Sequence, residues 1–274
     1  MMQAKLPKLG ILAGGGELPR LLIQSCREQG REVFVIAFKN QCDPATVEDV
    51  DHVWVRLGAA GSSIRHLRNS NVTNLVMAGA IKRPGFWSLM PDLRALRFVA
   101  GGWLNKGDDG LLRALIRMLE DEEGFRVIGA HEIRPELLSP VGILGSVQPS
   151  ATTDSSINAA VKAARDLGVQ DKGQAAVARD DRIIALEGAD GTDAMLRHLI
   201  KSGDAQGAVL AKMTKPQQDT RVDLPTIGLR TVENAHRAGL KGIIVEAGSS
   251  IIVDRDQVIA KANELGLFVV GVKT

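Results

Sequence analysis

The chain alternates short apolar, β-branched runs with helical patterns from one end to the other, and this alternation constrains its fold more than any other feature. Near-continuous apolar strands separated by helices are typical of a parallel sheet that is covered on both faces. The first half predicts strands at 9–13, 32–38, 52–57, 74–79 and 125–129, and helices at 18–29, 62–69 and 109–123. This order favours an α/β fold with an N-terminal Rossmann-like parallel sheet domain.

A change in composition separates the two halves of the chain. Residues 134–153 hold three prolines, two glycines and several small polar residues, which is typical of a linker. Beyond it the pattern predicts a hairpin that turns at Asp180 and Asp181. Helices are predicted at 155–167, at 192–201, from residue 231 onward and at 255–265, and strands at 207–213, 242–248, 250–254 and 267–272. We therefore expect a Rossmann-like domain at 1–133, a linker at 134–153 and a second α/β domain with a mixed sheet at 154–274.

Composition and charge argue against several classes of protein. The 274 residues are 45% hydrophobic, which is enough to bury the cores of one large or two ordinary domains. Lys and Arg number 34 and Asp and Glu 32, so the net charge is +2 and no cationic block predicts a nucleic-acid partner. The N-terminus lacks the apolar core of a signal peptide, and no stretch approaches the about 20 apolar residues that span a bilayer. We expect a soluble, cytoplasmic protein.

Cysteine and histidine chemistry is also disfavoured. The two cysteines, Cys26 and Cys42, cannot form a disulfide framework, and Cys26 has the position of a small core residue in a helix. The five histidines show no metal-ligand spacing, and none lies near a serine or cysteine in a recognisable nucleophile turn. The pattern therefore argues against a zinc site and against a histidine-based hydrolase.

A glycine-rich segment, AGGGELP at 13–19, lies directly between a predicted strand and a predicted helix. Gly14, Gly15 and Gly16 would let backbone amides approach an anion at the helix N-terminus. The dinucleotide fingerprint is incomplete, because Pro19 stands where its third glycine belongs and the second strand does not end in an acid that could hold a ribose. A tight turn that needs glycine for its geometry and a nucleotide or phosphate contact both remain open, whereas nicotinamide-dependent reduction is weakened.

Two acidic segments each open a predicted helix. In NKGDDG, at 105–110, either Asp108 or Asp109 could cap the helix, but one cap needs one side chain and Lys106 adds a cation beside it. The run Glu120–Glu123 at the other end of the same helix is predicted to be a solvated face.

The second acidic segment surrounds two glycines at 184–196. Glu187, Asp190 and Asp193 lie within seven residues, and Thr192 or Asp193 could cap the helix that follows. Carboxylates on a glycine-rich loop also suit a hard, oxygen-seeking cation, and since the spacing matches no EF-hand, such an ion would resemble Mg²⁺ shared with phosphate oxygens.

The segment KPQQDTRVDLPTIG, at 215–228, sets acid, base and acid at alternate positions. If it is extended, Asp219, Arg221 and Asp223 share one face at intervals of roughly 6.6 Å. Lys212 and Lys215 lie just upstream, directly after a strand with the pattern of a buried one. A charged surface strand is one interpretation; the other is phosphoryl chemistry, in which cations hold phosphate oxygens and acids bind Mg²⁺ or orient water.

Aromatic residues gather in one stretch, where Phe86, Trp87, Phe98 and Trp103 account for four of the nine Phe and Trp residues. Basic residues are interleaved with them. Such a stretch could meet acyl chains or a membrane surface, pack one domain against the other, or form a homodimer.

These segments together, and in this order, resemble one family: the bacterial UDP-2,3-diacylglucosamine pyrophosphatases of lipid A biosynthesis, of the type unrelated to calcineurin-like phosphoesterases. The resemblance covers nearly the whole chain, and its most specific mark is KMTKPQQDTRVDLPTIG at 212–228. The other marks are ILAGGGELP near the start, AGAIKRP at 78–84, KGDDGLL at 106–112, DKGQAAV at 171–177 and EGADGTDAML at 187–196.

The resemblance implies a Mg²⁺-dependent hydrolysis of the pyrophosphate in UDP-2,3-diacylglucosamine, giving UMP and 2,3-diacylglucosamine 1-phosphate, with water directed at the sugar-side phosphorus. It also implies two α/β domains around an interdomain site, a catalytic C-terminal domain, and work at the cytoplasmic face of the inner membrane as a peripheral protein.

Roles for the candidate residues follow from this resemblance. We expect Asp223 to be essential as a metal ligand or water-orienting base, with Asp219 as its partner and Glu187 and Asp193 completing the metal shell. We expect cationic side chains to offset the charge of the diphosphate: Lys212, Lys215 and Arg221. We expect the remaining candidates to contact the substrate, the glycines at uridine or phosphate and the aromatic pair at the acyl chains: Gly14, Gly15, Gly16, Lys106, Asp108, Asp109, Thr192, Phe86 and Trp87.

A function from another class stays open beside this one. In that alternative the glycine segment binds a nucleotide without turning it over, and the second domain signals to a partner. It predicts saturable binding and no product.

Overall fold

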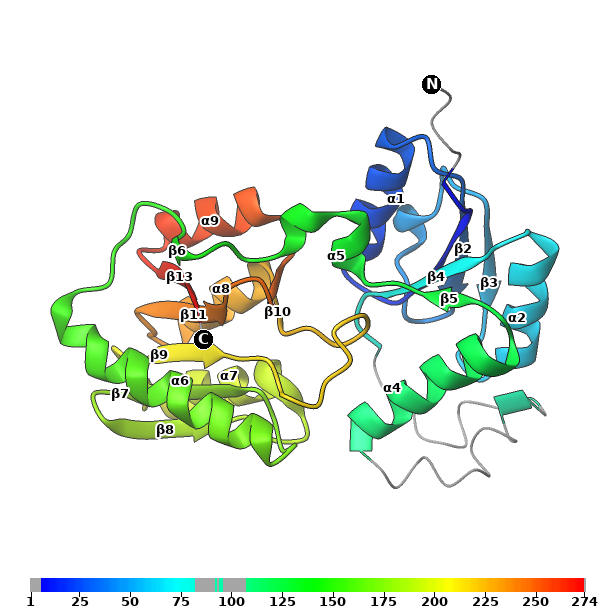
Figure 1. Ribbon diagram of the computed structural model, residues 1–274. Helices are drawn as coiled ribbons and strands as arrows, with labels where there is room; N and C mark the ends of the chain where they lie inside the picture. The colour runs from blue at the N-terminus through cyan, green and yellow to red at the C-terminus, as the bar shows by residue number, and fades with distance from the viewer. Residues whose placement is uncertain (1–5, 82–91, 93, 96–106, 274) are drawn as a thin grey trace. The chain divides into compact units, whose positions relative to one another are not determined.

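The computed structural model describes residues 6–81, 92, 94–95 and 107–273, except for the side chains of 107–109. The chain divides into two compact units, which are described separately below (Figure 1). The N-terminal unit comprises Met1–Pro135 together with the short segment Asp219–Asp223, and the C-terminal unit comprises Glu136–Gln218 and Leu224–Thr274.

The N-terminal unit contains a five-stranded sheet in the order β3-β2-β1-β4-β5, and every pair in it is parallel. The predicted parallel sheet is therefore confirmed, and its order is that of doubly wound folds. Its strands are β1 (Leu9–Ala13), β2 (Val33–Phe38), β3 (His52–Val55), β4 (Asn74–Ala78) and β5 (Arg126–Val127).

Helices flank this sheet because their apolar residues recur on one side. Helices α2 (Ala60–Asn69) and α4 (Gly107–Arg117) contribute Ile64, Leu67 and Ile116 to one apolar cluster with β2 and β4. Helix α1 (Leu18–Glu28) begins with a proline in its first turn, where the missing amide donor costs nothing, and it contacts α5 (Ala130–Ile133) on the other side (Figure 1). The α4 helix continues into a π-helical turn, η4 (Met118–Glu122).

The C-terminal unit contains a six-stranded sheet in the order β6-β13-β11-β9-β7-β8. β9, β11 and β13 are mutually parallel, whereas β6 and β7 pair antiparallel to their neighbours and β8 pairs antiparallel to β7, so the predicted mixed sheet is confirmed. The strands are β6 (Gly142–Ile143), β7 (Ala175–Arg179), β8 (Arg182–Leu186), β9 (Val209–Lys212), β11 (Gly242–Glu246) and β13 (Phe268–Val272). A separate parallel pair joins β10 (Thr226–Ile227) to β12 (Ile251–Ile252).

The two faces of this sheet are covered differently. Helix α6 (Asp154–Val169) packs on one face through Ala160 and Ala164, which meet the small side chains of Ala176, Ala178 and Ala211. The other face carries the larger apolar cluster, to which three helices contribute: α7 (Gly191–Ser202), α8 (Leu229–Arg237) and α9 (Arg255–Glu264). Figure 1 shows α6 alone in front of the sheet.

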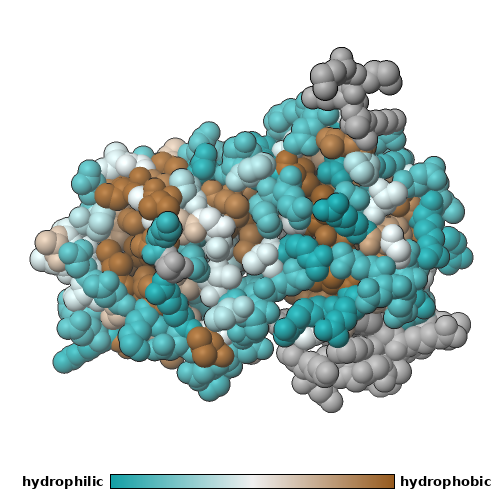
Figure 2. Space-filling model, viewed as in Figure 1, coloured by the Kyte–Doolittle hydropathy of each residue, from teal (hydrophilic) through white to brown (hydrophobic). Residues whose placement is uncertain are grey.

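The segment 134–153, expected to be a linker, contains three short elements. A 3-10 turn, η5 (Pro135–Leu137), comes first, then β6, which adds an antiparallel edge strand beside β13, and then a second 3-10 turn, η6 (Ala151–Thr153). The sequence pattern did not predict β6, because only two residues of a segment rich in proline and glycine form it. Val141 and Ile143 at this edge are exposed. Figure 2 shows hydrophobic patches over the region of β6 and β13.

No helix among the described residues combines the length and the apolar character that crossing a bilayer requires.

Candidate functional site

In doubly wound sheets, ligands bind outside the carboxyl ends of the strands, where the strand order reverses. In the N-terminal unit that place lies between β1 and β4, and the glycine segment follows β1 there. The amides of Gly14 and Gly15 donate to the carbonyls of Ala78 and Ala80, both at 2.8 Å, and the amide of Ala80 donates back to Gly15 at 2.9 Å. These two loops are therefore joined backbone to backbone.

The close approach explains why glycine occupies the segment. A Cβ at Gly14 would lie 2.6 Å from the carbonyl oxygen of Ala80, and one at Gly79 would lie 2.5 Å from that of Gly15. Gly16 has open space around it but a φ of +89°, which disfavours other residues. Because the first two amides are already bonded, an anion at this position would meet Gly16 and the start of α1.

The charged segment 219–223 is a closed turn, so the prediction of an extended segment with three side chains on one face is wrong. The carbonyl of Asp219 accepts from the amides of Val222 at 3.1 Å and Asp223 at 3.0 Å. The carboxylate of Asp219 also accepts from the backbone amide of Arg221, at 3.0 Å. An aspartate that bonds the amide two residues on is a common turn former, and this local bond outweighs the alternating pattern.

Arg221 closes the turn from its side chain as well. Its Nε and Nη2 donate to the two carboxylate oxygens of Asp219, at 3.0 Å and 2.8 Å, in a bidentate pair. The guanidinium lowers the pKa of Asp219, first by hydrogen bonding, and the carboxylate in return raises the pKa of Arg221. Both side chains therefore stay charged at physiological pH.

Glu120 connects this turn to the N-terminal unit. Its Oε1 accepts from Nη1 of Arg221 at 2.8 Å and from the amide of Val127, at the end of β5, at 3.0 Å. Val222 packs beside the apolar cluster of β2, α2 and α4. The turn thus belongs to the N-terminal unit, although the residues on both sides of it in the sequence belong to the C-terminal unit.

The prediction of a solvated face at Glu120–Glu123 is wrong for its two ends. Glu123 has a side chain only 6% exposed and pairs with Arg68 at 2.7 Å and with Arg94. The arginines that pair with the two ends of the run, Arg221 and Arg68, lie far from it in the sequence, so a run of charges alone does not predict these contacts.

Asp223 ends the turn and is partly buried. Among the described residues its carboxylate makes no hydrogen bond and no ion pair, and only its backbone amide is bonded, to Asp219. A carboxylate that no described residue bonds is available for chemistry.

Polar side chains of the C-terminal unit lie together at one end of the strands of its sheet, where β8, β9 and β11 end and β7 begins. Lys212, the last residue of β9, is only 9% exposed, and its Nζ donates to the carbonyl of Thr226 at 3.0 Å. Lys215 pairs with Asp171 at 3.1 Å. Both lysines therefore lie at or just beyond the carboxyl end of a buried strand.

Sequence reasoning missed the residues that hold this strand end in place. The amide of Thr214 donates to the carboxylate of Glu246 at 2.9 Å, and its hydroxyl donates to the carbonyl of Ser249 at 2.8 Å. The amide of Glu246 in turn donates to the hydroxyl of Ser250, which is fully buried, at 3.1 Å. The only sequence signal is the polar stretch EAGSS directly after a strand.

Glu187, at the same end of these strands, is buried and fully engaged. Its oxygens accept from the amide of Gln174 at 2.6 Å and from the hydroxyl of Thr192 at 2.5 Å, so the structure brings together two of the predicted site residues. Asp193 instead pairs with Arg230 at 2.5 Å. Within the described parts of the chain, no group of three His, Cys, Asp or Glu side chains is placed to hold a metal ion.

Some predicted site residues lie outside the description. Lys106, Phe86 and Trp87 are outside the described residues, and Asp108 and Asp109 lie in the first turn of α4 with side chains outside them.

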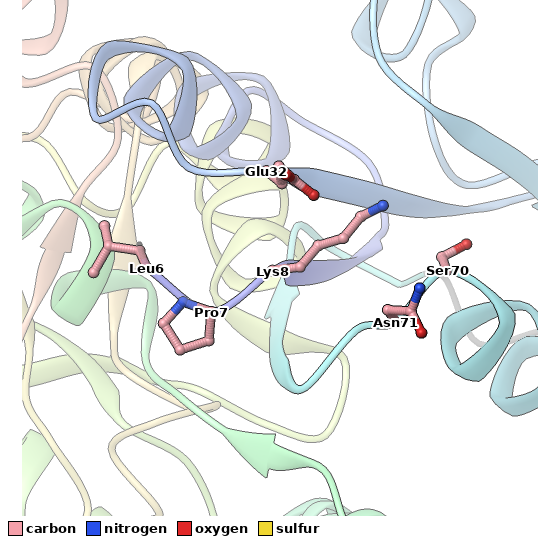
Figure 3. Close-up of a pocket in the computed structure, with 6 residues that line it drawn as sticks. All are labelled: Leu6, Pro7, Lys8, Glu32, Ser70 and Asn71. Atoms are coloured by element: carbon pink, nitrogen blue, oxygen red, sulfur yellow. The ribbon is translucent and has the colours of Figure 1, made fainter. Parts of the chain in front are cut away.

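A hollow of about 330 Å³ lies at the amino ends of the strands of the N-terminal sheet, opposite the ends that the glycine segment follows (Figure 3). Its lining residues lie just before β1, β2 and β4 in the sequence: Leu6, Pro7, Lys8, Glu32, Ser70 and Asn71. Because amino ends of parallel strands are not where such sheets bind ligands, this hollow is no candidate for the site.

Comparison with known proteins supplies the remaining observations. Residues 8–137 match the LpxI N-terminal domain family, and residues 140–270 match the LpxI C-terminal domain family. The chain is also 42% identical, over 274 residues and 97% of each chain, to the UDP-2,3-diacylglucosamine pyrophosphatase LpxI of Caulobacter vibrioides.

Proposed function

The chain belongs to the LpxI family, and we propose that it hydrolyses the pyrophosphate bond of UDP-2,3-diacylglucosamine to UMP and 2,3-diacylglucosamine 1-phosphate in lipid A biosynthesis. The observation that carries the proposal is the 42% identity over 97% of both chains to a protein named for this activity.

Asp223 is the residue on which the proposed chemistry depends. In the reaction, water forms a bond to a phosphorus atom, the bond from that phosphorus to the bridging oxygen breaks, and a proton leaves the water. A carboxylate that is not bonded by any described residue can orient the water and accept its proton. Asp219 and Arg221 support it by holding the turn closed.

The cations of the C-terminal unit have the complementary role. A diphosphate diester carries two negative charges, which repel an approaching nucleophile. Lys212 and Lys215 offset that charge from the end of β9, and the buried position of Lys212 strengthens its effect because the surrounding dielectric is low. Both would exchange protein contacts for phosphate oxygens on binding.

Magnesium is the proposed cofactor. Mg²⁺ is usually bound by one or two carboxylates and by substrate phosphates rather than by an all-protein cage, so the described residues, which form no such cage, fit an ion that arrives with the diphosphate. Asp223 would hold it, and Asp219, Glu187 and Asp193 would join only after leaving their present partners. Such an ion supplies charge neutralisation at the phosphate oxygens.

The lipid part of the substrate sets where the protein works. We propose that Phe86 and Trp87 shelter the acyl chains, that Gly16, Thr192, Lys106 and the acidic start of α4 contact the polar part, and that the protein acts as a peripheral protein on the cytoplasmic face of the inner membrane.

The test is direct. Purified protein incubated with UDP-2,3-diacylglucosamine and Mg²⁺ should yield UMP and the sugar phosphate in equal amounts, as separated by chromatography. A non-catalytic nucleotide-binding module would instead bind the substrate saturably and leave it intact, and that result would overturn the proposal.

A further inference from the structure

The turn 219–223 has an unusual position in the chain. It is five residues long, it is preceded and followed by the C-terminal unit, and it packs in the N-terminal unit. Asp223 is its last residue, directly before the chain returns at Leu224. Its backbone position is therefore set by whatever holds these five residues in place.

Two kinds of contact hold the turn. Val222 inserts an apolar side chain beside the cluster of β2, α2 and α4, and Arg221 reaches Glu120 and, at 3.4 Å, the carbonyl of Val127. Apolar packing fixes depth without fixing orientation, since it is not directional. The charged contact with Glu120 is directional, so it is suited to set the orientation of the turn.

Glu120 is itself held from a second side. The same oxygen that accepts from Arg221 also accepts from the amide of Val127, so the backbone at the end of β5 helps to hold the carboxylate that meets the guanidinium. Its place in the π-helical turn η4 makes this reach possible, and π-turns inside helices are frequent at functional sites. A series of hydrogen bonds therefore runs from Glu120 in η4 through Arg221 to Asp219, and it ends at the amide of Asp223.

Arg221 has few donors left for any other role. Its Nε, Nη1 and Nη2 all donate within this network. A phosphate could recruit Arg221 only by displacing a carboxylate.

We propose that Glu120 is a positioning residue for the hydrolysis, which acts through Arg221 to set the orientation of Asp223. The proposal rests on the proposed function. Glu120 touches neither the water nor the diphosphate; it determines whether the carboxylate that does so is aligned.

A purely structural role makes a different prediction. The side chains of Glu120 and Arg221 are 29% and 34% exposed, and ion pairs this open to solvent stabilise a fold only weakly. A positioning role therefore predicts a large effect on turnover with a small effect on unfolding, because misplacing a reacting group by about 1 Å lowers rates by about 10²-fold.

The experiment compares Glu120→Gln with Asp121→Asn, which removes the same charge from the neighbouring exposed residue. We expect Glu120→Gln to lower kcat by about 10- to 100-fold with KM changed less than about threefold. Asp121→Asn should leave both constants unchanged. The Tm of each variant should stay within a few degrees of the parent value.

Two further readouts separate the outcomes. Amide hydrogen exchange at Val222 and Asp223 should accelerate in Glu120→Gln and not in Asp121→Asn, whether or not substrate is present. In an Arg221→Gln background, adding Glu120→Gln should lower kcat no further, because residues that act as one unit are not additive.

Each contrary result has its own meaning. An inactive parent protein would overturn the proposed function and the positioning role with it. With an active parent, equal kcat values for Glu120→Gln and Asp121→Asn, unchanged exchange at the turn, or loss of cooperative unfolding in Glu120→Gln would overturn the role of Glu120 alone.

Discussion

Asp223 and Asp219 illustrate how one residue type serves two purposes within a single turn. The carboxylate of Asp219 accepts three hydrogen bonds from Arg221, whereas that of Asp223 makes none with the described residues. The sequence predicts both aspartates as site residues, because the spacing of residues shows their types but not the partners that their side chains will have. Glu120 escaped prediction for the same reason: it lies 101 residues from Arg221 in the chain.

Replacing Asp223 should separate activity from stability. We expect Asp223→Ala to lower kcat by about 10²- to 10⁴-fold, the range that a positioned proton acceptor contributes. Unfolding free energy should change by less than about 0.5 kcal/mol, because the removed group makes no hydrogen bond or ion pair with the described residues. Steady-state kinetics and chemical denaturation measure the two effects; a variant with most of its activity would remove Asp223 from the mechanism.

Asp219 should make stability depend on acid pH. Arg221 lowers its folded-state pKa below the ordinary 3.8, so the unfolded chain takes up a proton at a higher pH than the folded one. The contribution is complete above the ordinary pKa and is lost as pH falls through the folded value. The difference in unfolding free energy between the parent and Asp219→Asn should thus be constant above about pH 5 and shrink below about pH 4. A difference that grows on acidification would contradict this.

The elements themselves were largely predictable. All five strands of the N-terminal sheet and the hairpin of β7 and β8 were expected, because buried parallel strands are apolar throughout and hairpins turn at short polar pairs. The two-residue strands β6 and β10 and the turn at 219–223 were not expected as such. These three elements are fixed by long-range pairing and by local side-chain bonds, neither of which has a periodic signature in the sequence.

The backbone junction between the β1 and β4 loops gives an element-scale prediction. Gly14→Ala places a methyl group 2.6 Å from a backbone carbonyl, which can be relieved only by moving a loop. Gly16→Ala meets no neighbour and carries only the cost of its positive φ, about 1–2 kcal/mol. Chemical denaturation should therefore show Gly14→Ala to be the more destabilised variant; the reverse order would mean that the junction is loose.

At the scale of the whole molecule, the candidate residues fall in two units. The turn with Asp223 belongs to the N-terminal unit, and Lys212, Lys215, Glu187, Thr192 and Asp193 belong to the C-terminal one. The sequence allowed the candidates to be chosen, but it did not show that one short turn crosses from one unit to the other.

Metal removal tests the proposed cofactor. EDTA should abolish turnover, and Mg²⁺ in excess should restore it. Without substrate, Mg²⁺ should shift Tm by less than about 1 °C, because the described residues form no cage to bind it. Full activity in chelator would exclude the metal, and a large shift in the absence of substrate would indicate a resident protein site.

We propose that the diphosphate binds where the 219–223 turn presents Asp223. The most direct measurement is a crystal structure of the Asp223→Ala variant with UDP-2,3-diacylglucosamine bound. We predict that the diphosphate lies beside residue 223, at the end of the 219–223 turn. An ordered nucleotide sugar that binds away from this turn would show the proposal to be wrong.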